Sequence, residues 1–416
     1  MNFDDTPEEA AFRSDVRNWL DANAPRELEP ELRQSTFGMV GLKSIDPLVA
    51  AKAWQGRKFE AGWACLHWPR EFGGRGATPI QRVIWQQEEG PYAALSAMFS
   101  IGHNMCGPTL MAWADDAQKK ARLPALAAGT EIWCQLFSEP ASGSDLAGLR
   151  TRAEKDGDAW VINGQKIWTS RAHYSDFGLL LARTDPTVPK HKGLTMFFLD
   201  MRSPGIEIRP IKQANGGSSF NEVYFTDVRV PDSQRLGEVG QGWQVSLTTL
   251  MNERMSMGSK LSIGFAELFA FCRELELDGK PALEDRAVRS QLARFAVRES
   301  GLKCTAMRAV SAISKGENPG PENSIGKLVG ATGMQELAMY ALDLQGQAGI
   351  IDDTALMPLA ARFQTILLRS PATRVEGGTD EILRNIIAER VLGLPAENRV
   401  DKNVPFHQIP TRGSVV

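Results

Sequence analysis

The chain has 416 residues, of which 43% are hydrophobic and 23% are charged. These proportions are those of an ordinary globular protein, so we expect a large apolar core, and they exclude a disordered chain. At about 100–200 residues per domain, the length predicts two to four domains. The formal net charge of -3 provides no attraction toward nucleic acid or anionic membranes, and neither is expected as a partner.

The cysteines and histidines argue against a metal site. Five cysteines stand singly at 65, 106, 134, 272 and 304, and five histidines form no H-E-x-x-H motif. A disulfide framework and a thiolate zinc site are therefore not expected, and the cysteine usage favours a reducing compartment. The acidic start of the chain, Met1–Glu9, is unlike a signal or transit peptide. We therefore predict no metal and a cytoplasmic location.

The first third of the chain has helical patterns, from Pro7 to about Gly129. Residues Glu8–Leu20 place apolar side chains at helical spacing, with Thr6 as the expected N-cap, and Pro79–Glu89 is a second predicted helix. Gly90–Ala114 carries no charge over 25 residues, enough to span a bilayer. Its internal prolines and glycines favour buried helices beside a pocket instead, so no membrane span is predicted.

From about Glu131 to Leu236, short β-prone runs alternate with turn signals. Asn163-Gly164 is predicted to be a hairpin turn, because both of these residues tolerate a positive φ. With no long helix between the runs, the sheet is expected to be mostly antiparallel, as a sandwich or a barrel. The expected strands are Trp160–Ile162, Phe177–Ala182, Leu194–Leu199, Gly205–Ile211 and Glu222–Val230.

Long helical patterns return from Gln241 and indicate a helical bundle. Four helices are expected, at Leu283–Ser314, Glu322–Leu344, Asp353–Leu368 and Thr379–Leu392. The polar tail after Pro395 is expected to wrap a partner or to fray.

Several nucleotide and hydrolase motifs are missing. No strand is followed by G-x-G-x-x-G, Gly320–Lys327 has the wrong spacing for a P-loop, and no G-x-S-x-G elbow occurs. The most unusual segment is instead Trp133–Gly148 (WCQLFSEPASGSDLAG), where a strand-like run ends in small residues with many free N–H and hydroxyl groups. Such a turn can bind an anion or a polar heterocycle, and an ordinary tight turn between helix and sheet is the alternative.

Three blocks together resemble the acyl-CoA dehydrogenase family. They are Trp133–Gly148, Ile162–Ser170 (INGQKIWTS) and Glu376–Arg390 (EGGTDEILRNIIAER), and Trp68-Pro69 with Gly73-Gly74 agrees near the front. The resemblance implies an α+β fold with an N-terminal α-helical domain, a middle antiparallel β-barrel or sandwich domain and a C-terminal four-helix bundle. We expect these at 1–130, 131–238 and 239–395, followed by the tail at 396–416.

The same resemblance implies FAD as cofactor and assigns residues to it. Ser138 would bond the polar edge of the flavin, Trp168 would pack on the ring, Ser170 would reach toward N5, and Thr379 and Glu381 would meet the phosphate–ribose region. Ordinary strand packing is the alternative for Trp168. The full predicted cofactor set is Gln135, Leu136, Phe137, Ser138, Ser144, Trp168, Thr169, Ser170, Gly346, Thr379 and Glu381.

The position of the catalytic base departs from the common family pattern. The family often places a carboxylate directly before Gly-Thr, but here that position is Gly377, and Glu376 lies one residue too early. One residue moves a side chain by about 3.5 Å along an extended chain. Other members carry the base before an Arg on the first helix of the C-terminal domain, where this chain has Glu253-Arg254. Glu253 is therefore the preferred base and Glu376 the alternative, while a solvated helix acid is the non-catalytic interpretation of Glu253.

The substrate assignments also follow from the resemblance. The backbone N–H of Gly377 would donate to the thioester carbonyl, as a stabiliser of the developing enolate. Ser144, Arg254 and Gly378 would contact the substrate, with Arg254 orienting the base or the nearby backbone.

The implied activity is α,β-dehydrogenation of an acyl-CoA thioester to a trans-2-enoyl-CoA, with electrons passing to an electron-transfer flavoprotein. A carboxylate would take the α-proton as flavin N5 takes the β-hydride. Two alternatives remain, a non-catalytic partner subunit of a hetero-oligomeric dehydrogenase and a flavin-dependent monooxygenase on the same fold. A homodimer or homotetramer is expected, and a hetero-oligomer is possible. Together with this resemblance, the missing loop carboxylate indicates a branched or bulky acyl group.

Overall fold

The computed structural model describes residues 5–35, 40–256, 264–314, 320–398 and 400–410. The chain forms two compact units, each built from separate segments. The bundle unit contains Met1–Asp46, Thr78–Ala94 and Met257–Pro395, and the sheet unit contains Pro47–Ala77, Leu95–Ser256 and Ala396–Val416. None of the helices in the described part of the chain has the length and hydropathy needed to cross a bilayer.

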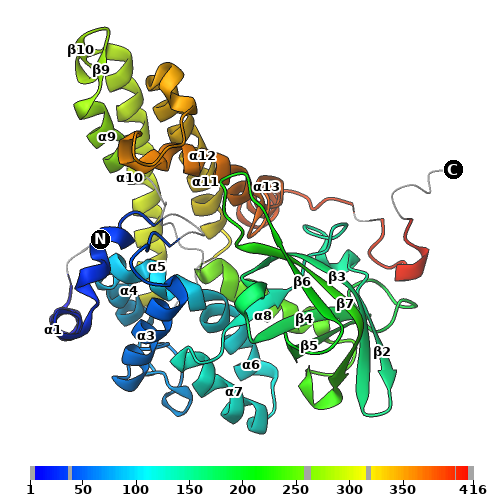
Figure 1. The fold of residues 1–416 in the computed structure, drawn as a ribbon. Coiled ribbons are helices and arrows are strands. Elements are labelled where there is room, and N and C mark those ends of the chain that lie inside the picture. Colours follow the sequence, from blue (N-terminus) through cyan, green and yellow to red (C-terminus); the bar gives the residue numbers. More distant parts are fainter. Residues whose placement is uncertain (1–4, 36–39, 257–263, 315–319, 399, 411–416) are drawn as a thin grey trace. The chain divides into compact units, whose positions relative to one another are not determined.

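The bundle unit is helical apart from one short hairpin (Figure 1). The hairpin strands β9 (Glu276–Leu277) and β10 (Lys280–Pro281) pair in an antiparallel register. The helices are α1 (Pro7–Asn23), α2 (Glu29–Leu32), α4 (Pro79–Glu88), α9 (Phe265–Glu274), α10 (Arg286–Ser314), α11 (Asn323–Leu344), α12 (Arg362–Val375) and α13 (Asp380–Ile386). α1 begins where the sequence indicates, because the Thr6 hydroxyl accepts from the Glu9 N–H at 3.3 Å while Glu9 accepts from the Thr6 N–H at 2.7 Å.

The core of the bundle lies among α9, α10, α11 and α12. Its buried side chains include Phe271, Leu292, Leu337 and Phe363, one from each helix. The structure differs from the predicted helices at two places. The third expected helix does not begin at Asp353, because residues 358–361 form a 3₁₀ turn with positive φ at 359–361, and α12 starts at Arg362. The helix α9 was not predicted, although it supplies part of this core.

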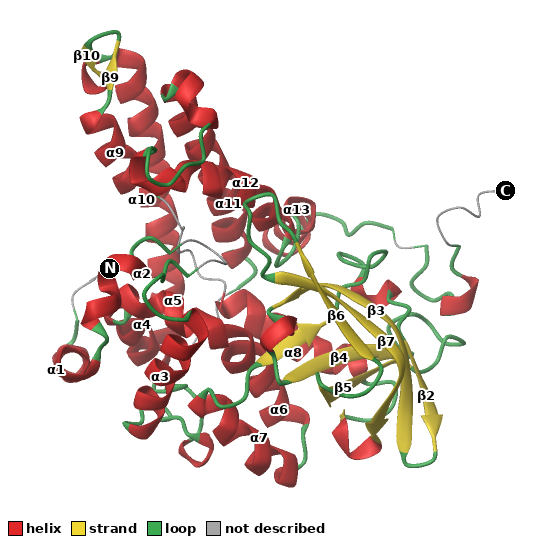
Figure 2. Ribbon diagram, viewed as in Figure 1, coloured by secondary structure: helices red, strands yellow, loops and turns green. Residues whose placement is uncertain are grey.

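The sheet unit contains an eight-stranded sheet and four longer helices (Figure 2). The helices are α3 (Pro47–Glu60), α6 (Gly107–Trp113), α7 (Asp116–Ala128) and α8 (Gly242–Ser256), and the short α5 (Ala93–Ser96) lies at the junction of chain segments. The strands are β1 (Trp133–Leu136), β2 (Arg152–Asp156), β3 (Ala159–Ser170), β4 (Phe177–Arg183), β5 (Leu194–Asp200), β6 (Ile206–Ile211), β7 (Phe220–Pro231) and β8 (Arg235–Leu236).

The strand order is β6-β7-β3-β2-β4-β5-β8, with β1 added beside β4. The pairs of β1 and β2 with β4 are parallel and the other pairs are antiparallel, which confirms the expected mostly antiparallel sheet.

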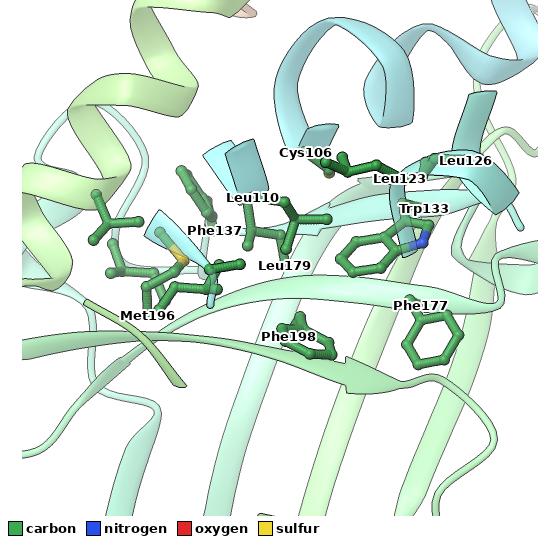
Figure 3. Close-up of a cluster of buried hydrophobic side chains, with 14 of the residues drawn as sticks. Cys106, Leu110, Leu123, Leu126, Trp133, Phe137, Phe177, Leu179, Met196 and Phe198 are labelled. Atoms are coloured by element: carbon green, nitrogen blue, oxygen red, sulfur yellow. The ribbon is translucent and has the colours of Figure 1, made fainter. Parts of the chain in front are cut away.

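Both faces of the central strand β4 are buried, in two different cores. Leu179 and Leu181 point into a core shared with α6 and α7, whereas Leu180 and Ala182 point into a core closed by the curved sheet itself. The alternation follows from the two-residue period of a strand. In the first core, Leu110, Leu126 and Trp133 lie against the side chains of β4 and β5 (Figure 3). This core holds Trp133, the first residue of β1, with which the unusual segment begins.

Asn163-Gly164 does not form the predicted hairpin turn. The β2–β3 connection turns at Gly157, with φ +62°, and Asn163-Gly164 lies within β3 at a register shift opposite β7. The Asn163 side chain exchanges hydrogen bonds with Asp227, at 2.9 and 3.0 Å. A Cβ on Gly164 would lie 2.5 Å from the Thr151 hydroxyl. The pair therefore marks a bulge, where the missing side chain permits close approach of β2.

The expected fraying of the tail is also corrected over residues 400–410. This segment packs on the loop between β4 and β5 of its own unit, with the Phe406 N–H donating to the Val188 carbonyl at 2.9 Å. Its binding to another chain stays a prediction.

Candidate functional site

A bulge in β3 presents Trp168 to the outside of the sheet. The β3–β7 register shifts between Lys166 and Thr169, so an extra residue is inserted, and Trp168 has φ +58°. A left-handed conformation is rare for a bulky residue and marks a constrained position. The indole is 56% exposed and meets Phe220 edge-on at 6.1 Å. This exposure is compatible with the predicted packing of Trp168 on a flavin ring, which stays a prediction.

Regular pairing with β7 resumes at the two residues after Trp168. Thr169 is buried and pairs with Asn221, which donates from Nδ2 to the Thr169 carbonyl at 2.9 Å. Its hydroxyl Oγ1 is buried and has no hydrogen-bond partner within the described ranges. Ser170 is half-buried and pairs with Phe220. A buried hydroxyl without a protein partner is a position where a ligand atom or a water molecule can complete the hydrogen bonding.

A buried ion pair ties the bulge to the segment that follows β1. Lys166 Nζ lies 2.8 Å from Glu139 Oε1 and 3.0 Å from the Phe137 carbonyl, and both side chains are almost fully buried. Glu139 also accepts from the backbone N–H groups of Arg150 and Thr151, at 2.6 and 2.9 Å. Burial opposes the charge on Glu139, but Lys166 and these hydrogen bonds hold the pKa of Glu139 below its ordinary value.

The Ile167 N–H donates to the Ser138 carbonyl at 2.9 Å, which brings the predicted flavin residues of β1 beside Trp168. Gln135 and Ser138 are half-buried and can present polar atoms. Leu136 and Phe137 are buried, and their side chains lie in the two cores. Contact of these two residues with a flavin would therefore involve the main chain, and it stays a prediction.

The loop Ser142–Gly148, called here the signature loop, projects its middle outward. Gly143, Ser144 and Asp145 are exposed, whereas the Ser142 hydroxyl folds back to the Asp145 carbonyl at 2.5 Å. The predicted position of Ser144 at the cofactor or coenzyme A end is compatible with this exposure.

Glu253 lies near the end of α8 and continues its packed face. Val245, Ser246 and Thr249 are fully buried, and Thr249 shares a 2.9 Å hydroxyl contact with Thr109. Glu253 is one turn beyond Thr249 on the same side of the helix and is half-buried. The opposite face carries Met251, which is 63% exposed, and the role of Glu253 as the base stays a prediction. The side chain of Arg254 lies outside the described residues.

In the bundle unit, Glu376 is already bound to another side chain. It follows α12, and its Oε2 lies 2.6 Å from the Arg369 guanidinium, which is itself buried. Burial raises the pKa of Glu376 although Arg369 opposes the shift. Its second oxygen, Oε1, has no partner among the described residues. The carboxylate is thus committed to a structural ion pair through one oxygen.

The two glycines after Glu376 have backbone conformations that disfavour side chains. Gly377 and Gly378 have φ +62° and +100°, so a carboxylate at the family's usual loop position would be strained here. Lys327 on α11 donates to the Gly378 carbonyl at 2.6 Å and to the Arg374 carbonyl at 3.2 Å. Lys327 therefore fixes the loop whose Gly377 N–H is the predicted carbonyl donor.

Thr379 caps α13, accepting from the Ile382 N–H at 3.3 Å, and Glu381 is exposed in the first turn. Asp380 is buried beside them and bonds Arg374 at 2.7 Å. Gly346, at the end of α11, is exposed with φ +56°. The contacts of Thr379, Glu381 and Gly346 with a cofactor stay predictions.

Sequence reasoning missed the residues that support these positions. Lys166, Glu139, Lys327 and Arg369 hold the bulge and the glycine loop through the contacts above. Lys166 lies beyond the predicted strand Trp160–Ile162, between the polar Gln165 and the apolar Ile167, so no local pattern marked it. Within the described ranges, no group of three or more His, Cys, Asp or Glu side chains is arranged to hold a metal ion.

Comparison with known proteins identifies the family. Sequence models of the acyl-CoA dehydrogenase N-terminal, middle and C-terminal domains match residues 6–130, 134–228 and 240–392. The chain belongs to the acyl-CoA dehydrogenase family. It is 37% identical over 393 residues to acyl-CoA dehydrogenase IpdE1 of Mycobacterium tuberculosis, covering 93% of this chain and 98% of the relative.

Solved structures of the family share the fold. The Mycobacterium tuberculosis ChsE4-ChsE5 complex matches with a TM-score of 0.75 and 28% identity, covering 95% of this chain and 100% of the matched chain. The Tcur3481-Tcur3483 steroid acyl-CoA dehydrogenase matches with a TM-score of 0.79 and 27% identity, over 95% and 100% of the two chains. The predicted α+β fold is thereby confirmed, and this family member is an oxidoreductase.

FAD is the cofactor of this acyl-CoA dehydrogenase, and its residues fit that group. The exposed Trp168 indole provides a flat apolar face, and the Thr169 hydroxyl beside it is buried without a protein partner in the described part of the chain. Gln135 and Ser138 add polar atoms at the neighbouring end of β1. An aromatic face next to hydrogen-bonding groups suits a flavin, whose ring is apolar on its faces and polar along one edge.

Proposed function

We propose that the protein catalyses the α,β-dehydrogenation of an acyl-CoA thioester to a trans-2-enoyl-CoA, with Glu253 as the base. The observation that carries the assignment of the base is the 2.6 Å ion pair between Glu376 and Arg369. It engages one oxygen of the alternative carboxylate, while Glu253 continues the inner face of α8. The positive φ at Gly377 further supports a base outside the loop.

Each residue of the proposed mechanism has a defined task. Bound FAD supplies the ring that accepts the β-hydride, with Trp168, Thr169, Ser138 and Gln135 as its contacts in the sheet unit. Glu253 removes the α-proton of the thioester. The Gly377 N–H donates to the thioester carbonyl, which acidifies the α-carbon. Lys327 keeps that N–H in place through the Gly378 carbonyl.

We propose a bulky, ring-bearing acyl group as substrate. The absence of a carboxylate at Gly377 supports this class, and the matched Tcur3481-Tcur3483 structure is described as a steroid acyl-CoA dehydrogenase. An electron-transfer flavoprotein is the proposed electron acceptor. The division into domains at 1–130, 131–238, 239–395 and 396–416 also stays a proposal, as does the cytoplasmic location.

A second candidate is a partner subunit within a hetero-oligomeric dehydrogenase. It is supported by two matched structures whose names each combine two proteins, ChsE4-ChsE5 and Tcur3481-Tcur3483. A homodimer or homotetramer is the alternative assembly. Purifying the chain alone separates these proposals, because a partner subunit would hold no stable FAD and would show no turnover by itself.

The function is tested by anaerobic bleaching of the bound flavin with coenzyme A thioesters. The panel runs from short straight chains to branched and steroid-ring acyl groups. We expect ring-bearing thioesters to bleach the flavin and short straight chains to fail. Bleaching by short chains alone would contradict the substrate class. FAD that no thioester bleaches, but that reoxidises rapidly in air after chemical reduction, would favour the monooxygenase alternative.

Removing the exposed indole should affect FAD more than folding. Trp168→Ala is expected to weaken FAD binding about tenfold, since an aromatic stacking contact contributes about 0.5–1.5 kcal/mol. The unfolding midpoint should hardly change, because the side chain is more than half exposed. Flavin retention during dialysis and a thermal melt of the apoprotein measure the two effects. Trp160→Phe, at a buried strand position, is the control with the reverse pattern. It should lower the unfolding midpoint and leave FAD affinity unchanged.

A further inference from the structure

Three segments of the sheet unit meet around two basic side chains. They are the signature loop, the loop of residues 184–193 between β4 and β5, and the C-terminal segment of residues 401–409. The C-terminal segment lies beyond the family match, which ends at residue 392. Its contacts are therefore a feature of this chain that the family assignment does not explain.

Lys190 connects the signature loop to the C-terminal segment. Its Nζ lies 2.9 Å from Asp145 Oδ2 in the signature loop and 2.6 Å from Asp401 Oδ2 in the C-terminal segment. The Lys190 side chain is only 9% exposed, so its charge is screened weakly by solvent. Two carboxylates from segments far apart in the sequence thus share one cation.

Arg183, at the end of β4, holds the other side of the signature loop. It donates to the Ala147 carbonyl at 2.6 Å and to the Leu149 carbonyl at 3.1 Å, and also to the Lys190 carbonyl at 3.2 Å. The Phe406 ring lies over the Arg183 guanidinium, with its centroid 3.4 Å from Cζ. Phe406 therefore shields from water the guanidinium that orders the signature loop.

Main-chain contacts fix the C-terminal segment in this position. Pro405 forms an antiparallel bridge with Pro189, and the N–H groups of Phe406 and His407 donate to the carbonyls of Val188 and Pro186, at 2.9 and 3.0 Å. The segment is docked by backbone pairing, and the side chains of Asp401 and Phe406 contact Lys190 and Arg183, which in turn bind the signature loop.

We propose that Asp401 and Phe406 are positioning residues, which hold the signature loop in the conformation that binds the coenzyme A part of the substrate. This inference rests on the proposed function, since it takes Ser144 and its neighbours as the coenzyme A contact. Neither residue touches substrate or cofactor. They act through Lys190 and Arg183.

The first test uses coenzyme A itself and the FAD-loaded enzyme. Asp401→Asn and Phe406→Leu are expected to raise the Kd for coenzyme A, measured by calorimetry, about twofold to fivefold each, the range of a partly exposed charge contact and of a cation–π contact. Asp401→Glu should restore binding, because it restores the charge beside Lys190. Lys402→Ala, at an exposed neighbouring position, is the control and should bind as the wild type does.

A second measurement tests whether the raised Kd for coenzyme A results from a change in the signature loop. Amide hydrogen exchange at residues 142–148 should be faster in Asp401→Asn, and the effects of Asp401→Asn and Asp145→Asn on the Kd should be non-additive. Equal Kd values for wild type and both variants would overturn the inference while the proposed function stands. A raised Kd in Asp401→Asn with unchanged amide exchange at residues 142–148 would overturn it as well. A wild type that binds no coenzyme A would overturn both, and flavin bleaching by thioesters tells these outcomes apart.

Discussion

Replacing Glu253 with glutamine is expected to slow anaerobic flavin reduction by a thioester about 10²–10⁴-fold, the range of a positioned general base. Glutamine keeps the shape of the side chain and its place on α8 but cannot take the α-proton. FAD content and the unfolding midpoint should stay near the wild-type values, since Glu253 is only half-buried at the end of the helix. Stopped-flow absorbance of the flavin gives the rate directly.

The matched variant is Glu376→Gln. It loses the charge beside the buried Arg369, so we expect a lower unfolding midpoint but flavin reduction within about tenfold of wild type. Glu397→Gln, at an exposed position, should change neither quantity. A loss of reduction confined to Glu376→Gln would move the base to the loop. Equal, small effects of both variants would support the non-catalytic subunit.

The second large effect is expected for Lys166→Met. The substitution leaves Glu139 buried without its counter-charge, and breaking such a pair costs about 3–5 kcal/mol of the free energy of unfolding. The same change releases the Phe137 carbonyl, so the segment beside Trp168 should also bind FAD more weakly. Urea unfolding followed by tryptophan fluorescence measures the stability, and equilibrium dialysis measures the flavin.

The double variant Lys166→Met/Glu139→Gln should recover part of the stability, because it no longer buries an unpaired carboxylate. Lys155→Met on β2 is the control. Its ion pair with Asp232 is 44% and 34% exposed at the two side chains, so the loss should stay below about 1 kcal/mol. A Lys166→Met protein as stable as this control would show that the buried pair contributes little to the fold.

Helices and strands were predictable where the hydrophobic periodicity of the sequence is enough to define them. The strands at Phe177–Arg183 and Leu194–Asp200 and the long helix Arg286–Ser314 lie within a few residues of their predicted bounds. The turn signal of Asn163-Gly164 misled because it is local, whereas the bulge depends on the approach of Thr151, which directly precedes β2. The start of α12 was missed because a left-handed turn at residues 359–361 replaces the first helical residues, which apolar spacing does not reveal.

The sequence motifs predicted which residues form the candidate site, but they did not predict the side chains that support those residues. The motifs placed Trp168, Ser138 and the glycine loop, and the bulge now accounts for the exposure of Trp168. The partners of these residues come from elsewhere in the sequence, as Lys327 does for Gly378 and Arg369 for Glu376. Such pairs join residues that are far apart in the sequence, so no local spacing pattern in a single sequence reveals them. Asp401 and Phe406 lie in a polar tail whose composition gives no hint of docking.

The discontinuous make-up of the two units has a consequence for biosynthesis. The chain crosses from one unit to the other after residues 46, 77, 94, 256 and 395. A nascent chain emerging from the ribosome therefore cannot complete the bundle unit before residue 395 has appeared. The sheet unit receives the contacts of Asp401 and Phe406 only after residue 406 has emerged. Neither unit can therefore form its complete set of contacts from its earlier segments alone, and the partly synthesised chain exposes apolar surface until the later segments have emerged.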